Sequence, residues 1–395
     1  MYNKKMYELG NKPSPIRELY EYGKKAKTIL GDNHVYDFSI GNPSAPTPQI
    51  VGDTIIELLN DLDSKTLHGY TSAYGEFGVR QAISDYLNEK YHANTDPDFL
   101  YLTCGAAAAL AITFNAILEK NDEVVIFAPY FPEYKVFIEK AQGKAKVLNL
   151  NKKNYQIDIE KLKKAINSNT KAVLINSPNN PTGTILSEDT IIDLTNMLRD
   201  KEKELGHPIY LISDEPYREL IYDGSEYPFV TNYYDDSIIC YSFSKVLSIP
   251  GERIGYILIS KTCDDVVSLY KAICGAGRSL GYVQAPTLFQ YVVAKCLGYT
   301  SDLSVYSENN NLLVTSLRKI GYKIIEPQGA FYIFMKALEK NAKAFSDKAK
   351  EMGLLLVPSD LFGIKGYVRI AYCVKESTIK NSFDAFKKLY ERYQK

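Results

Sequence analysis

Short apolar segments alternate with longer amphipathic segments between about residues 95 and 260, and this pattern constrains the fold more than any other feature. A short apolar segment suits a strand that is buried on both faces, whereas apolar residues at helical spacing suit a helix that covers a sheet. Repeated strand and helix units of this kind build a mostly parallel sheet. The expected strands are Phe99 to Thr103, Glu123 to Phe127, Ala172 to Asn176, Ile209 to Ser213, Ser237 to Tyr241 and Ile254 to Ile259.

Helices are expected between these strands, because the intervening sequences place apolar residues on one helical face. The expected helices are Ala106 to Leu118, Ile157 to Asn167 and Ser187 to Glu204.

The pattern changes after about residue 285. A long helical stretch from Ala285 to Arg318 is expected there, followed by strands at Lys323 to Met335 and Tyr367 to Ala371 around a Pro-Gln-Gly turn, and this mixture favours a smaller α+β domain. Near the amino terminus, a helix from Ile16 to Leu30 and an extended segment from Val35 to Ile40 are expected to pack on that domain or on a partner subunit. The predicted division is an amino-terminal segment (1–45), a large domain (46–285) and a small domain (286–395).

The charge balance limits the kinds of partner. The 395 residues contain 47 Lys plus Arg and 47 Asp plus Glu, and no long basic segment offers a surface to nucleic acid or an anionic membrane. Small-molecule partners are expected instead. The first residues are polar and no apolar segment has the length of a membrane span, so a cytoplasmic location is expected. The six Cys and four His lack the spacing of a zinc site, so no metal is expected.

Five motifs with polar residues or glycine follow the expected strands at the end where open α/β sheets bind ligands. The first, Cys104-Gly105-Ala106-Ala107, begins a helix, and the free amides of its first turn can bind a phosphate. A tight turn without a ligand explains the motif equally well.

The second and third motifs supply an aromatic ring and an amide. Phe131, between Tyr130 and Pro132, can stack on a flat ring, although in a chain with 32 Tyr and 16 Phe a core position is the simpler explanation. Asn180 lies in a turn rich in Pro, Asn and Gly, and turn formation explains the Pro and Gly better than it explains this amide.

The last two motifs supply ionisable groups. Asp214 ends an apolar strand, and a carboxylate at the edge of a core needs a cation or several donors; a protonated ring nitrogen would be such a cation, and helix capping is the alternative. Lys245 lies among Ser242, Ser244 and Arg253, a set that can bind a phosphate and supply an amine, although a lone lysine after a strand is usually a solvated charge. A lysine amine can form a Schiff base with a carbonyl cofactor, and a carboxylate can keep its pyridine nitrogen protonated.

In this order the motifs resemble those of the class I/II aminotransferases, the aspartate aminotransferase family of fold-type I pyridoxal-phosphate enzymes. The resemblance extends from Gly41 in Phe38-Ser39-Ile40-Gly41-Asn42-Pro43 to Arg369 in Tyr367-Val368-Arg369-Ile370. It implies an α/β fold with a mostly parallel seven-stranded sheet sandwiched by helices in a large domain, together with a smaller α+β domain. It also implies pyridoxal 5'-phosphate as the cofactor.

The same resemblance implies a role for each motif. Lys245 would be the Schiff-base lysine and later the proton shuttle, Asp214 would hold the pyridinium nitrogen, and Tyr217 and Asn180 would bond the ring oxygen. Phe131 would stack on the ring, where the family often has Trp. The phosphate would be held by Gly105, Ala106, Ala107, Ser242, Ser244 and Arg253, with Ala106 and Ala107 in places that often carry polar side chains.

Substrate binding and assembly are implied in the same way. Arg369 matches the arginine that holds the substrate α-carboxylate, and Gly41 and Asn180 would lie beside that carboxylate. Tyr70 matches a tyrosine that reaches the phosphate of the neighbouring subunit, which implies a homodimer with shared active sites. Arg278 lies broadly where some relatives bind a distal carboxylate, so aspartate and glutamate are the expected donors; an ordinary helix-surface arginine is the alternative.

The predicted activity is therefore an aminotransferase of amino acid metabolism, in which an L-amino acid gives its nitrogen to the cofactor and a 2-oxo acid such as 2-oxoglutarate removes it. A β-elimination lyase is the alternative, because fold and cofactor do not fix the reaction type. A regulatory domain without activity is a third hypothesis, although the segment before Gly41 is too short for a DNA-binding module.

Overall fold

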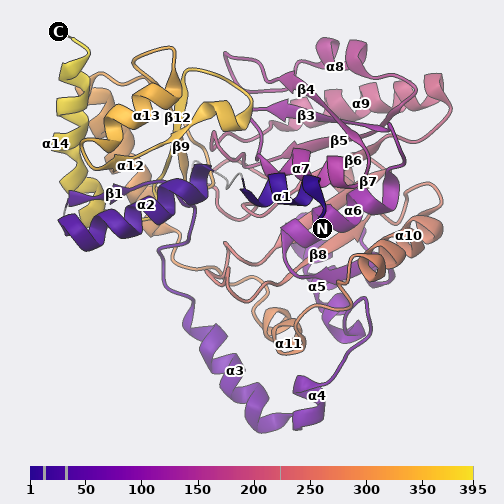
Figure 1. Ribbon diagram of the computed structural model, residues 1–395. Helices are drawn as coiled ribbons and strands as arrows, with labels where there is room; N and C mark the ends of the chain where they lie inside the picture. Colours follow the sequence, from indigo (N-terminus) through magenta and orange to yellow (C-terminus); the bar gives the residue numbers. More distant parts are fainter. Residues whose placement is uncertain (12–14, 32–33, 223, 395) are drawn as a thin grey trace.

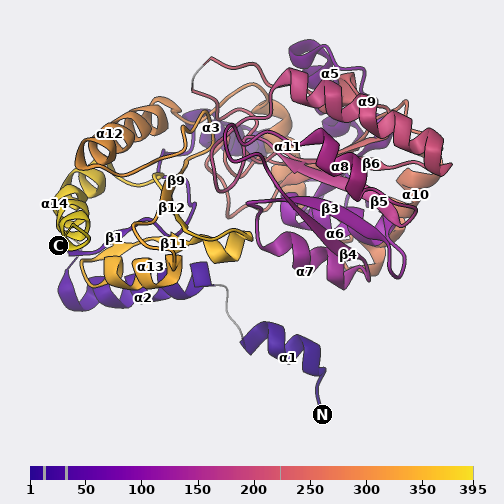
Figure 2. The ribbon, with the colours of Figure 1, turned by 90° about the horizontal axis from the view of Figure 1, so that it is seen from above.

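The structure is a computed structural model that describes residues 1–11, 15–31, 34–222 and 224–394. A large α/β unit lies beside a smaller unit formed by the carboxyl-terminal part of the chain and helix α2 (Pro15–Leu30), as the two views in Figure 1 and Figure 2 show. Helix α1 (Lys4–Asn11) projects from the body of the molecule in Figure 2 and has no buried residue. In the described part of the chain, no helix has both the length and the hydrophobicity needed to cross a membrane.

The central sheet confirms the predicted fold class. Its neighbouring strands are parallel except for β8, which runs antiparallel to both of its neighbours, β2 and β7. Within the described residues the sheet has seven strands, in the order β2 (Leu100–Thr103), β8 (Gly255–Ile259), β7 (Ser237–Ser242), β6 (Tyr210–Asp214), β5 (Thr170–Asn176), β3 (Glu123–Ala128) and β4 (Lys144–Asn149).

Helices cover both faces of this sheet, and alternate residues of each strand point to opposite faces. In β3, Val124 and Ile126 pack toward α6 and α7, whereas Val125 and Phe127 pack toward α8 and α9. All four side chains are buried, which is why the strand sequences are continuously apolar. The helices of the large unit are α3 (Gln49–Asp61), α4 (Ser64–His68), α5 (Phe77–Tyr91), α6 (Ala106–Ile117), α7 (Glu133–Lys140), α8 (Ile159–Ala165), α9 (Glu188–Leu205), α10 (Val266–Ser279) and α11 (Thr287–Lys295), with short 3-10 turns η2 (Pro97–Phe99) and η3 (Val230–Asn232).

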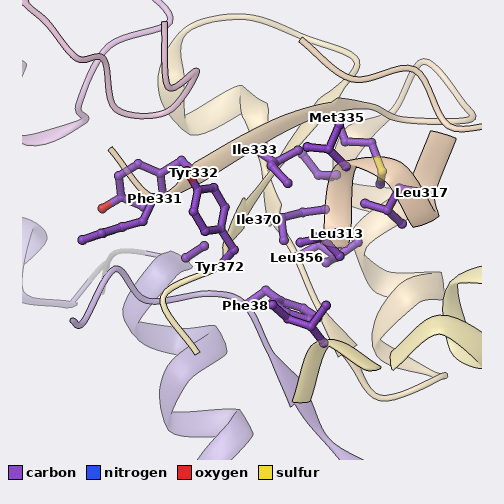
Figure 3. Close-up of a cluster of buried hydrophobic side chains, with 14 of the residues drawn as sticks. Phe38, Leu313, Leu317, Phe331, Tyr332, Ile333, Met335, Leu356, Ile370 and Tyr372 are labelled. Atoms are coloured by element: carbon purple, nitrogen blue, oxygen red, sulfur yellow. The ribbon is translucent and has the colours of Figure 1, made fainter. Parts of the chain in front are cut away.

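The smaller unit has its own hydrophobic core, to which the amino-terminal segment contributes. Phe38 packs with Leu356, Ile370 and Tyr372 in this core (Figure 3), and β1 (Tyr36–Asp37) pairs in parallel with β10 (Leu354–Leu355). The remaining elements of the unit are α12 (Ser304–Ile320), β9 (Tyr332–Lys336), α13 (Ala342–Lys350), β11 (Val357–Pro358), η4 (Ser359–Phe362), β12 (Tyr367–Ala371) and α14 (Glu376–Arg392).

Three expectations about secondary structure were wrong. The helical stretch from Ala285 to Arg318 is broken between α11 and α12. Gly298 lies in this break with a positive φ of 83°, and a right-handed helix cannot continue through that conformation. Residues 323–331 form no regular strand and contribute only isolated bridges through Ile324 and Gly329. Strand β4 was not expected, because as an edge strand it has no fully buried residue and mixes Lys and Asn with apolar residues instead of forming an apolar run.

Candidate active site

One cleft, at the carboxyl ends of the parallel strands, collects most of the residues that the sequence singled out. It encloses about 950 Å³ of space, part of it open to solvent. Strands β6 and β7 end at the cleft, α6 begins there, and β12 and the segment before α3 reach it from the smaller unit. Its lining residues are Ile16, Ile40, Gly41, Ala106, Ala107, Leu110, Phe131, Asn180, Asp214, Pro216, Tyr217, Ser242, Ser244, Lys245, Pro250, Arg253, Tyr332 and Arg369.

Lys245 presents its amine in the middle of this cleft. Its Nζ donates a hydrogen bond of 2.8 Å to the Gly41 carbonyl oxygen and lies 5.5 Å from the centre of the Phe331 ring. Burial lowers the pKa of Lys245 to about 8; the Cys373 thiol opposes this shift, and the positive charges of Arg253 and Arg369 contribute to it. About a tenth of this amine is therefore neutral, and so nucleophilic, at pH 7, far more than for an ordinary lysine.

Asp214 presents an unsatisfied carboxylate oxygen to the same cleft. Its Oδ2 accepts a hydrogen bond of 2.5 Å from the Tyr134 hydroxyl, whereas Oδ1 is buried without a hydrogen-bond partner. Burial raises the pKa of Asp214 to about 7; the Tyr134 hydrogen bond opposes this rise, and the neighbouring Glu215 carboxylate contributes to it. Such an orphaned acceptor is costly unless a cationic donor meets it, so the site is suited to a protonated nitrogen.

The amino terminus of α6 and the Arg253 guanidinium form the opposite end of the cleft. Gly105 caps α6 with a φ of 83°, and a Cβ at this position would lie 2.9 Å from Arg253 Nη2, so a side chain would collide with the guanidinium. Arg253 itself has a positive φ of 56° and is held by bonds from Nη1 to the Pro250 carbonyl (2.9 Å) and from Nη2 to the Cys104 carbonyl (3.3 Å).

Two serine hydroxyls complete this end. Ser242 and Ser244 share a hydrogen bond of 2.7 Å between their hydroxyl groups and are both buried. With the free amides of the first turn of α6 and the Arg253 charge, they form a donor-rich pocket that is suited to a phosphate group.

Arg369 is a buried cation on the side of the cleft formed by β12. It is 2% exposed. Its Nη1 donates a hydrogen bond of 3.1 Å to Asn180 Oδ1, and its Nη2 donates one of 2.5 Å to the Ser39 carbonyl oxygen. Its Nε has no hydrogen-bond partner, and its guanidinium lies 4.6 Å from the centre of the Tyr332 ring. A planar fork with free N–H groups in a closed site is suited to a carboxylate.

Gly41 and Tyr217 lie next to these groups. A Cβ at Gly41 would lie 2.1 Å from the Tyr332 hydroxyl oxygen, so only glycine fits here. The Tyr217 and Tyr332 hydroxyls are 2.8 Å apart, and burial raises the pKa of Tyr332 to about 12. Both tyrosines are therefore neutral hydroxyl donors at physiological pH.

Three of the predicted residues lie outside the cleft lining: Gly105, which caps α6 directly before Ala106, and Tyr70 and Arg278. Tyr70 follows α4 and is 92% exposed, and Arg278 is an exposed residue in the last turn of α10. Neither is brought to the cleft by this single chain.

Sequence reasoning missed Tyr134 and Tyr332. Tyr134 lies in the first turn of α7, and its ring centre is 5.6 Å from that of Phe131, which precedes the helix; its nearness in sequence to a proposed stacking ring was an available signal. Tyr332 begins β9, and no local pattern distinguishes it from the many other tyrosines of the chain.

Comparisons with known proteins agree with this geometry. The family model described as aminotransferase class I and II matches residues 33–386. The chain belongs to this family. An aspartate aminotransferase from Thermotoga maritima is 30% identical over 376 residues, which cover 94% of this chain and 95% of that protein.

A solved structure is more similar still. The crystal structure of an amino transferase from Eubacterium rectale superposes with a TM-score of 0.98 at 52% identity, and the match covers 100% of both chains. A (5-formylfuran-3-yl)methyl phosphate transaminase from Methanocaldococcus jannaschii is 28% identical over 368 residues, covering 91% of this chain and 92% of that protein. The resemblance to class I/II pyridoxal-phosphate-dependent aminotransferases is thus confirmed, and the relatives differ in the substrates that their names give.

The raised pKa of Asp214 predicts a pH dependence of folding in the cofactor-free protein. An aspartate titrates near 3.8 in the unfolded chain and at about 7 here, so the folded state retains its proton longer. The associated stability is complete below about pH 4 and is lost as the pH rises through 7, by about 4 kcal/mol at most. Thermal unfolding of the cofactor-free protein and its Asp214→Asn variant between pH 5 and 8 should therefore show a steeper decline in the parent. Parallel curves would contradict the prediction.

Proposed function

We propose that this protein is a pyridoxal-phosphate-dependent aminotransferase that moves the amino group of an L-amino acid to a 2-oxo acid, with Lys245 as the cofactor-binding and proton-transferring residue. One observation supports the proposal most directly: three groups line a single cleft. They are a lysine amine with a lowered pKa, a carboxylate oxygen without a hydrogen-bond partner, and a helix amino terminus suited to a phosphate.

The residues of the cleft fit this cofactor. Asp214 Oδ1 would accept the pyridinium N–H, and the amides of Gly105, Ala106 and Ala107 with Ser242, Ser244 and Arg253 would hold the phosphate. Phe131 would stack on the ring, while Tyr217 and Asn180 would donate to its oxygen. When bound, pyridoxal phosphate supplies a carbonyl carbon for an amine and a ring that accepts electrons from the substrate.

Lys245 would transfer protons, and Arg369 would bind and orient the substrate. The Lys245 amine, with its pKa of about 8, can take a proton from the substrate α-carbon and return one at a neighbouring carbon near neutral pH. Arg369 and the Gly41 amide would fix the α-carboxylate and thus orient the α-carbon toward Nζ. The apolar Ile16 and Ile40 at the cleft would limit access of water.

A homodimer is part of the proposal. Tyr70 is almost fully exposed and, as the tyrosine that matches the family's intersubunit residue, would reach the phosphate site of a second copy. Ile56 and Leu59 on α3 and Phe77 at the start of α5 are also more than half exposed, and apolar side chains of this size are suited to burial against a second copy.

Aspartate and glutamate are the proposed donors, with 2-oxoglutarate as the acceptor. The proposal rests on Arg278, an exposed cation that a second copy would have to bring to a neighbouring cleft. We expect Arg278→Ala to lower kcat/KM for aspartate about tenfold or more, the loss of one charged hydrogen bond, and to leave kcat/KM for an aromatic donor unchanged. Equal effects on both donors would remove this role.

A steady-state panel of amino donors with 2-oxoglutarate tests the activity itself. Formation of glutamate from 2-oxoglutarate, in proportion to the oxo acid that the donor yields, is the expected result. Release of ammonia and oxo acid from cysteine without any acceptor would instead favour the lyase.

A further inference from the structure

A buried cluster of charges lies behind the proposed cofactor site, on the side of the Asp214 turn that faces away from the cleft. Asp214, Pro216 and Tyr217 line the cleft, whereas Glu215 and Arg218 do not. Glu215 and Arg218 are 0% and 2% exposed, so both charges are removed from water. A buried arginine that touches no substrate needs a structural reason.

The Arg218 guanidinium uses each of its nitrogen atoms. Nη1 lies 2.8 Å from Glu215 Oε2, Nε lies 3.2 Å from Glu219 Oε1, and Nη2 donates 2.9 Å to the Tyr256 hydroxyl. Its planar group also lies 4.2 Å from the centre of the Tyr241 ring, and the Tyr241 hydroxyl donates 3.0 Å to Glu219 Oε2. The side chain is thus fixed by ion pairs, a neutral hydrogen bond and stacking.

These partners come from three different segments of the cofactor site. Glu215 and Glu219 belong to the turn that carries Asp214 and Tyr217, Tyr241 directly precedes Ser242 in β7, and Tyr256 in β8 follows Arg253 by three residues. Tyr241 and Tyr256 are also register partners in the sheet, with rings stacked at 4.8 Å. One guanidinium therefore connects the chain segments that would bind the ring nitrogen, the phosphate and the carbonyl carbon.

We propose that Arg218 is a positioning residue for the cofactor. From the side of the Asp214 turn that faces away from the cleft, it fixes the positions of the Asp214 turn, the Ser242–Lys245 segment and the Arg253 segment relative to one another. The proposal rests on the proposed function. It predicts that loss of Arg218 weakens pyridoxal-phosphate binding, although no atom of Arg218 lines the cleft.

The test must separate positioning from folding, because Arg218→Met alone leaves two buried carboxylates without their cation and can unfold the protein. The informative variant combines Glu215→Gln, Arg218→Met and Glu219→Gln, which removes all three charges together and keeps similar side-chain volumes. Neutral replacement of a whole buried ion cluster is commonly tolerated, so this variant should fold. Arg218→Lys keeps the charge without the planar fork, and Arg199→Met, at a half-buried arginine on α9, is the matched control.

Cofactor-free proteins are titrated with pyridoxal phosphate and followed by absorbance, alongside thermal unfolding and the pH dependence of the bound-cofactor spectrum. We expect the triple variant to unfold near the temperature of the parent, to bind pyridoxal phosphate about tenfold or more weakly, and to shift the pH midpoint of the spectrum. The affinity of Arg218→Lys for the cofactor should lie between those of the parent and the triple variant. Arg199→Met should match the parent in all three measurements. Unchanged affinity and midpoint in the folded triple variant would overturn the positioning role. If the triple variant does not fold, parent-like affinity in Arg218→Lys would overturn it. A parent that does not bind pyridoxal phosphate would overturn the proposed function instead.

Discussion

Replacing Lys245 with alanine is expected to lower the rate of transamination by at least about a thousandfold, because the variant loses both its nucleophilic amine and its general base. The Nζ atom is the only amine among the residues that line the cleft, and its pKa of about 8 suits proton transfer near neutral pH. Stopped-flow and steady-state assays with an amino donor and 2-oxoglutarate measure the loss.

The same variant should still bind pyridoxal phosphate, though more weakly, because Asp214, Arg253 and the first turn of α6 are unchanged. Its absorbance spectrum should be that of the free aldehyde cofactor rather than that of the lysine-bound form. Lys203→Ala, which removes an exposed lysine from α9, is the matched control and should leave turnover and spectrum unaltered. Turnover of Lys245→Ala at the parent rate would exclude the proposed role.

The sequence predicted the buried strands well, because a strand that is buried on both faces consists of consecutive apolar residues. Residues 172–175 of β5 and 238–241 of β7, for example, form buried and almost wholly apolar runs, and polar residues follow where each strand reaches the cleft. The edge strand β4 shows no such apolar run, since one of its edges is unpaired and none of its residues is fully buried. The break between α11 and α12 was missed because both helices place apolar residues at helical spacing, and that pattern did not mark where the first helix ends.

The cleft was predictable to the extent that its residues follow strand ends. Asp214 ends β6 and Lys245 follows the end of β7 by three residues; because these two strands are adjacent and parallel, local order along the chain brings both residues to the same edge of the sheet. Tyr332 approaches Tyr217, and the Gly41 carbonyl approaches Lys245, through packing between the two units, and no short-range sequence pattern indicates these contacts. The Tyr134 bond to Asp214 lies within the large unit, but it too is a long-range contact, since it joins residues 80 positions apart.

Replacing Arg369 with leucine is expected to lower kcat/KM by about 10²- to 10⁴-fold for the amino donor and for the 2-oxo acid alike. Each charged hydrogen bond contributes about 1.5–3 kcal/mol, and a carboxylate would lose two of them. Both substrates carry the same α-carboxylate, so the loss should be shared and should fall mainly on KM. Cofactor affinity should change little, because Arg369 lies on the β12 side of the cleft, away from Gly105 and Arg253.

Thermal unfolding of Arg369→Leu distinguishes this interpretation from a loss of folding, because the substitution leaves Asn180 Oδ1 and the Ser39 carbonyl without their donor. Arg369→Lys provides the sharper comparison. It retains a positive charge of similar reach but presents a single ammonium in place of the planar fork, so it should recover part of the binding and little of the orientation. KM should then improve more than kcat relative to Arg369→Leu. A loss confined to one of the two substrates would show that Arg369 reads a side chain rather than the shared carboxylate, and the alignment of the α-carbon with Lys245 would have to come from another group.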